Sequence, residues 1–140
     1  MRHDETVVTV AGMPVRAYRA GAGPPLVLLH GGGPDGARLT WEPIWDTLTP
    51  RFSVVAPDLP GYGGRWVVGF LDACGLGAVT LVGVSLGGRA AVRTALDEPA
   101  RVSGLVLFGR RRAGDDLAGV ACPVLAADTV RADPILNLRR

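Results

Sequence analysis

A chain of 140 residues, 48% of them apolar and 20% charged, is long enough for one buried core and is not a disordered segment. Its net charge of +2 is too small to indicate a nucleic-acid partner, and its apolar runs are too short to cross a membrane. We expect a single domain, residues 1–140. The charged start is unlike a signal peptide and both cysteines lie in apolar contexts, so we expect buried thiols and a cytoplasmic location.

Apolar runs of strand length alternate with helix-like stretches along the chain. Helical crossovers between buried strands make those strands parallel, so we predict an α/β fold with a mostly parallel sheet flanked by helices. In chain order we expect paired strands at 6–10 and 15–18 around a turn at 12–14, a strand at 26–29, a helix at 41–48 with Thr40 as N-cap, a strand at 52–56, a helix at 66–74 stopped by Gly75, a strand at 79–84, a helix at 86–96, and strands at 102–108 and 124–127.

A candidate nucleophile lies between the expected strand at 79–84 and the helix at 86–96. Gly83, Ser85 and Gly87 form a Gly-x-Ser-x-Gly pattern there, which is typical of a nucleophile elbow. A serine on a tight, strained turn needs neighbours without Cβ atoms, because the strand and helix backbones approach closely. The alternative is a serine that only caps the helix.

Four segments, in the right order within residues 15–109, resemble the α/β-hydrolase superfamily. They are His-Gly-Gly-Gly-Pro at 30–34, the turn at 56–63, the elbow at 82–88 and the strand entry at 99–107. The resemblance implies that Ser85 is the nucleophile and that the N–H groups of Gly32 and Leu86 form the oxyanion hole. One such donor contributes roughly 3–4 kcal/mol to transition-state stabilisation. The alternative for the glycines is a simple turn.

The family activates its serine with a histidine after the eighth strand, oriented by a carboxylate. This chain has two histidines, His3 and His30, and neither follows Ser85. By resemblance, Asp133 is the best match to the acid and Asp128 is the alternative. The core is expected to be truncated, without the cap domain and the eighth strand. His30 is either structural, holding the glycine loop, or a surrogate base, and His3 is expected in solvent.

Loss of a triad member costs on the order of 10⁴–10⁶ in kcat, yet the oxyanion hole and binding retain roughly 10³–10⁴ over water. We therefore expect a lidless serine hydrolase of carboxylesterase type that cleaves small, short-acyl esters weakly. The alternatives are a catalytically incompetent remnant that binds a small ligand and, suggested by the loop at 30–34 alone, a C–C bond hydrolase.

Neither a cofactor nor a metal is implied, because the glycine run lacks dinucleotide-binding spacing and the cysteines form no metal motif. The expected partner is a small ester, with neither nucleic acid nor membrane. An incomplete sheet would leave an exposed edge strand, which favours pairing into a homo-oligomer. Asp58 is expected to brace the turn on which it lies.

Overall fold

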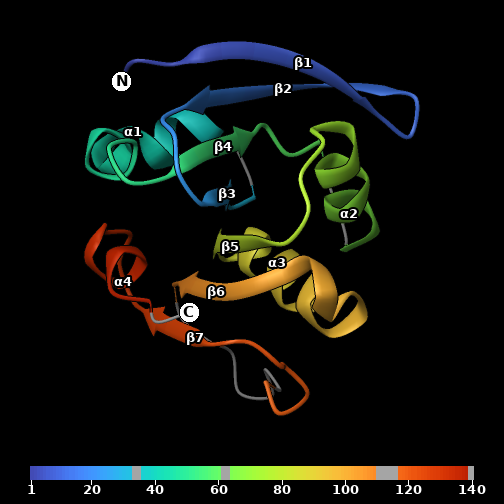
Figure 1. The fold of residues 1–140 in the computed structure, drawn as a ribbon, viewed down its shortest axis with the longest axis vertical. Helices are drawn as coiled ribbons and strands as arrows, with labels where there is room; N and C mark the ends of the chain where they lie inside the picture. The colour runs from blue at the N-terminus through green and yellow to red at the C-terminus, as the bar shows by residue number, and fades with distance from the viewer. Residues whose placement is uncertain (33–35, 61–63, 110–116, 139–140) are drawn as a thin grey trace.

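One mostly parallel sheet runs through the described part of the molecule (Figure 1). The computed structural model describes residues 1–32, 36–60, 64–109 and 117–138, without the side chains of residues 64 and 65. Its strands are Asp4–Val10 (β1), Met13–Ala20 (β2), Pro25–Leu29 (β3), Ser53–Pro57 (β4), Val79–Val84 (β5), Val102–Phe108 (β6) and Val124–Ala127 (β7). They follow the order β1-β2-β4-β3-β5-β6-β7, in which β1, β2 and β4 pair antiparallel and the strands from β4 to β7 run parallel.

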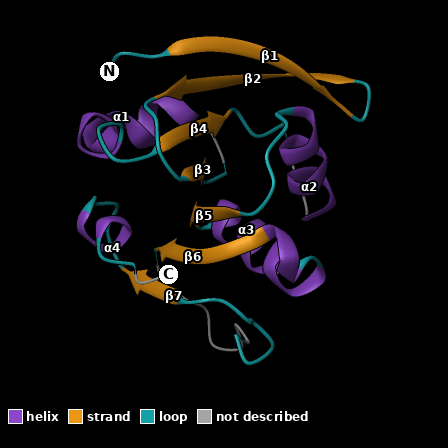
Figure 2. Ribbon diagram, in the orientation of Figure 1, coloured by secondary structure: helices purple, strands orange, loops and turns teal. Residues whose placement is uncertain are grey.

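Helices cover both faces of this sheet, and each face has its own apolar core. The helices are Ala37–Leu48 (α1), Gly64–Ala73 (α2), Leu86–Asp97 (α3) and Asp133–Leu136 (α4), and a 3-10 turn spans Pro99–Arg101. Figure 2 shows α1 and α4 on one side of the sheet, and α2 and α3 on the other. Trp41 and Ile135 are buried on the α1 side, Phe70 and Leu81 on the α2 side. The predicted fold class is therefore confirmed.

The first hairpin differs from its prediction, since its turn lies at Ala11 and Gly12 rather than at 12–14. Val10 pairs with Met13, so the connection has two residues. Both have positive φ, +50° and +79°, which is the hairpin geometry that matches the right-handed twist of paired strands. An alanine in this conformation carries no turn signal, so the sequence misplaced the turn.

The expected N-cap at Thr40 is wrong. α1 begins at Ala37, and the Thr40 N–H donates to the Gly36 carbonyl at 3.1 Å, inside the helix. The Ala37 N–H, which has no acceptor within the helix, donates a hydrogen bond to the carboxylate of Asp58 at 2.9 Å. Asp58 lies just after β4, far from α1 in the sequence. Asp58 thus braces its turn against α1, and this cap cannot be found from local sequence.

Three side chains that we expected to be either fully buried or fully exposed are of intermediate burial. Cys74 and Cys122 are partly exposed rather than buried, although desolvation still raises the pKa of each thiol. His3 is partly buried rather than solvated, because its ring packs edge-on against Tyr18 with centroids 5.0 Å apart. Among the helices that the structure describes, none has the length and apolar character needed to cross a membrane.

The Asp58 cap predicts a stability effect. Asp58→Ala leaves the Ala37 N–H without its acceptor, and we expect a loss of about 1 kcal/mol in the free energy of unfolding. Urea titration measures this loss. Glu42→Ala, which removes an exposed carboxylate from the same helix, is the control and is expected to change stability by less than about 0.5 kcal/mol. Equal losses in the two variants would contradict the capping role.

Candidate functional site: a strained serine beside a glycine loop

Ser85 joins β5 to α3 in a backbone conformation that side chains rarely adopt. Its φ is +50° and its ψ is −109°, and such strain costs on the order of 1–3 kcal/mol. Two hydrogen bonds hold it: the Ser85 N–H donates to the Phe108 carbonyl at 3.2 Å, and the Ser85 carbonyl accepts from the Arg89 N–H at 3.0 Å. The residue is exposed. The turn is therefore the sharp strand-to-helix geometry that the sequence pattern predicts.

The glycines on either side of Ser85 are required by close backbone contact. A Cβ atom on Gly83 would lie 2.5 Å from the Gly87 carbonyl oxygen and from Gly88. A Cβ atom on Gly87 would collide with the Leu29 carbonyl oxygen and lie 2.6 Å from that of His30. Backbone atoms in a sheet cannot move aside cheaply, so both positions admit only glycine without a shift of β3, β5 or α3.

The glycine loop after β3 runs beside this elbow. Leu29 pairs with Gly83 in the parallel β3–β5 register, so the residues that follow Leu29 lie along the turn. A Cβ atom on Gly31 would lie 3.8 Å from the Ser85 Cβ, and one on Gly32 would lie 3.3 Å from the Leu86 side chain. The structure thus brings Gly32 and Leu86 together. Residues 33 and 34 of the motif lie outside the described residues, as do residues 61–63 of the turn after β4.

The His30 ring is buried and both of its nitrogens are engaged. The Leu59 N–H donates to Nε2 at 2.8 Å, so the ring proton is on Nδ1, which donates to the Gly31 carbonyl at 2.6 Å. The ring therefore joins the loop after β3 to the turn after β4. In this tautomer its lone pair is occupied by an amide proton, a geometry that favours the structural interpretation over the surrogate base. The Leu59 N–H, a backbone group, carries no sequence signal.

The two candidate acids lie at different places after β7. Asp133 is the first residue of α4, is exposed and pairs with Arg131 at 3.1 Å. Asp128 directly follows β7, and the β5–β6–β7 register places it two strands from Ser85 at the same end of the sheet, about 10 Å away by strand spacing. Within the described residues, neither carboxylate hydrogen-bonds to Ser85. The described residues also hold no cluster of three or more metal-ligating side chains.

A parallel sheet with a strained serine turn at the carboxyl end of β5 defines an α/β core of the nucleophile-elbow type. The chain belongs to the alpha/beta hydrolase fold family, whose model matches residues 24–114. The resemblance found in the sequence motifs is thereby confirmed at the level of the family.

Relatives within the family have several activities. The chain is 35% identical over 133 residues to a 2-hydroxymuconate semialdehyde hydrolase from Pseudomonas sp. (strain CF600), covering 84% of this chain and 44% of the relative. It is 37% identical over 128 residues to a pimeloyl-[acyl-carrier protein] methyl ester esterase from Aeromonas hydrophila, covering 81% and 50%. The solved structure of a carboxylesterase from Bacillus subtilis superimposes with a TM-score of 0.69 at 25% identity, covering 77% and 43%. The chain thus spans about half the length of the curated relatives it matches, or less.

The backbone contact at Gly87 predicts a large stability effect. Gly87→Ala forces a methyl group against the Leu29 and His30 carbonyls, and we expect a loss of about 3 kcal/mol or more in the free energy of unfolding. Gly77→Ala is the matched control, because its Cβ would meet no heavy atom within 4 Å. Chemical denaturation of both variants measures the difference. A Gly87→Ala protein as stable as the Gly77→Ala protein would show that the elbow relaxes freely.

Proposed function

We propose that this chain is a serine hydrolase of carboxylesterase type, which cleaves small, short-acyl esters through Ser85. The observation that carries the proposal is the strained, exposed conformation of Ser85 next to Gly32 and Leu86. Strain of this kind persists only where the surroundings impose it, and it clusters at functional sites. Membership of a family with esterase and other hydrolase relatives supports the reaction class.

The proposed reaction begins with attack of the Ser85 hydroxyl oxygen on the ester carbonyl. The carbonyl oxygen becomes an oxyanion, and we assign its stabilisation to the N–H groups of Gly32 and Leu86, aided by the positive end of the α3 dipole. Collapse of this intermediate breaks the bond to the alcohol, which leaves with the serine proton. Water then attacks the acyl-serine, releases the carboxylic acid and restores the hydroxyl.

Proton transfer is the step for which this chain offers no evident general base. It has no histidine after Ser85, and the His30 lone pair already accepts the Leu59 N–H. We therefore propose His30 as a positioning residue for the glycine loop, and Asp133 as the acid, with Asp128 as the alternative. With a weakly activated nucleophile, the expected rate is roughly 10³–10⁴ over water, far below that of a complete triad.

A second candidate function is hydrolysis of a C–C bond in a vinylogous diketone. Its support is the glycine loop at 30–34 together with the 35% identity to a 2-hydroxymuconate semialdehyde hydrolase. The absence of a cap domain between residues 109 and 119 remains a prediction, because residues 110–116 lie outside the described residues.

We also propose that neither a cofactor nor a nucleic acid takes part in the reaction. Copies of the chain are proposed to pair through the edge strand β7, where Leu125 is 36% exposed.

The esterase proposal predicts that hydrolysis of p-nitrophenyl acetate and butyrate depends on Ser85. Ser85→Ala is expected to lower the rate by about tenfold or more, because the nucleophile is gone and only binding and the oxyanion hole remain. Ser103→Ala, an exposed serine on β6, is the control and should keep the wild-type rate. Equal activity in all three proteins, or activity in none, would leave a hydrolase fold without competent catalysis.

His30 is predicted to act through structure. His30→Ala removes partners from the Leu59 N–H and the Gly31 carbonyl, so we expect the free energy of unfolding to fall by about 1–3 kcal/mol, with loss of esterase activity. Paired measurements of stability and activity check this, with His3→Ala as the histidine control that retains activity. A His30→Ala protein with wild-type stability but no activity would instead indicate that the ring is the base.

A further inference from the structure

Arg89 lies one helical turn after the candidate nucleophile. It is the fourth residue of α3, and its N–H donates to the Ser85 carbonyl at 3.0 Å. Helical residues four apart share a face, and helical side chains lean toward the N-terminus of their helix, over the preceding turn. Because that preceding turn is the elbow, helix geometry puts the exposed Arg89 on the same side of α3 as Ser85.

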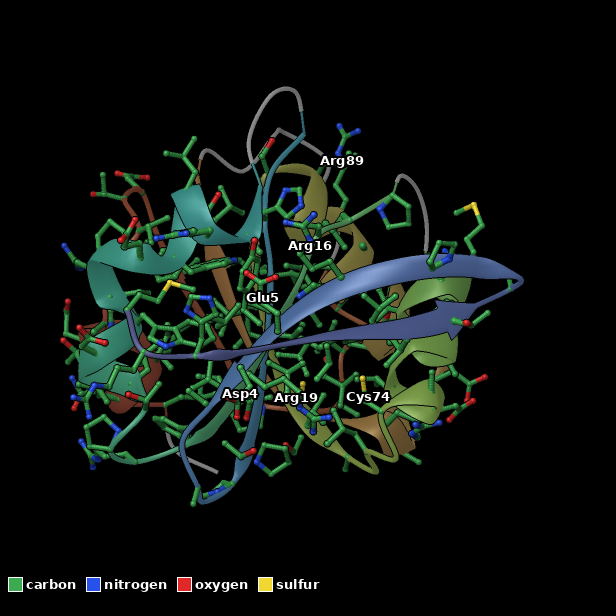
Figure 3. The ribbon with its side chains drawn as sticks, turned by 90° about the horizontal axis from the view of Figure 1, so that it is seen from above. Asp4, Glu5, Arg16, Arg19, Cys74 and Arg89 are labelled. Atoms are coloured by element: carbon green, nitrogen blue, oxygen red, sulfur yellow. The ribbon has the colours of Figure 1, made fainter. Side chains whose placement is uncertain are left out.

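The charge of Arg89 is uncompensated among the described residues, where its side chain has neither an ion pair nor a hydrogen bond. Arg93, one turn further along α3, pairs with Asp97 at 2.9 Å. Figure 3 shows Arg16 and Arg89 toward the same end of the molecule. Arg16 is already engaged there, since a hydrogen bond to Tyr18, followed by the charges of Tyr18 and nearby carboxylates, raises its pKa. An exposed guanidinium with no counter-ion in the described part of the chain can bind an anion.

A cavity lined by described residues lies away from the candidate site. Ser85 and Gly32 are both exposed. An open cavity of about 490 Å³ is lined by residues 1–4 and 19–21, but it lies at the opposite end of the strands from Ser85. The β2–β4 register shows this, because Ala20 pairs with Val54 near the start of β4, whereas Ser85 follows the end of β5.

We propose that Arg89 binds a carboxylate carried on the acyl chain of the substrate, a few bonds from the ester carbonyl. The planar fork of a guanidinium matches a carboxylate and donates two parallel hydrogen bonds to it. The preferred substrates are then half-esters of dicarboxylic acids rather than neutral fatty esters. This inference rests on the proposed function of Ser85, and it names the substrate class of that site.

The test compares two aryl esters of equal chain length, mono-p-nitrophenyl adipate and p-nitrophenyl hexanoate, with the enzyme-free rate subtracted. The measured quantity is the ratio of kcat/KM for the anionic ester to that for the neutral ester. Arg89→Gln is expected to lower this ratio about tenfold, the lower end of what a hydrogen bond to a charged group contributes. Arg89→Lys should retain part of the preference, and added salt should reduce it.

Arg93→Gln is the matched control, since it neutralises an exposed arginine of the same helix and is expected to keep the wild-type ratio. A ratio unchanged in Arg89→Gln overturns the inference but leaves the esterase proposal intact if hydrolysis still requires Ser85. If the wild-type chain hydrolyses neither ester, the esterase proposal fails. Saturation-transfer NMR then measures binding of monomethyl adipate to the wild-type, Arg89→Gln and Arg93→Gln proteins. Binding that is lost only in Arg89→Gln supports the role of Arg89, and binding that is equal in all three, or absent from all three, overturns it.

Discussion

The contact between the backbones of β3, β5 and α3 is the constraint on which the site depends. A Cβ atom added to Gly83 would overlap Gly87 and Gly88 across the elbow, and one added to Gly87 would overlap the Leu29 carbonyl. These approaches are possible only without Cβ atoms, and they force the chain to reverse direction within one residue. That residue is Ser85, so its positive φ and its exposure follow from packing between main chains rather than from its own side chain. The same packing places Gly32 beside Leu86.

Polar contacts from the turn after β4 hold two parts of the segment that follows β3. The Leu59 N–H binds the buried His30 ring, and the Asp58 carboxylate binds the first amide of α1. Neighbouring residues thus hold the glycine loop after β3 and the helix that follows it. Loss of the buried ring would leave its hydrogen-bond partners unpaired, at a cost of about 1–3 kcal/mol. Residues 30–32 are therefore held in place without a ligand, as the proposed stabilisation of a transition state requires.

The sequence predicted the elements whose signal is local and missed the contacts that join distant parts of the chain. Buried parallel strands read as apolar runs, so the strand into the elbow was placed correctly, and Gly75 ends α2 with a positive φ of +68°. The start of α1 was missed because its cap, Asp58, lies 21 residues away. The Ser85 turn was found from its glycines, while the Leu59 partner of His30 is a backbone amide that any residue could supply. The shelter of His3 depends on Tyr18, which reaches it through pairing of β1 and β2.

The two parts of the proposed chemistry have different structural origins. The proposed nucleophile and oxyanion donors follow neighbouring parallel strands, so the β3–β5 register brings them together. The acid candidates come from beyond β7, and Asp133 already has Arg131 as its partner. Under the proposed function, stabilisation of charge comes from the centre of the sheet, whereas proton transfer depends on groups near its edge. In the proposed site the backbone retains the roughly 10³–10⁴ of rate that does not need a base, and the proposed role of Arg89 concerns which ester is held rather than how its proton moves.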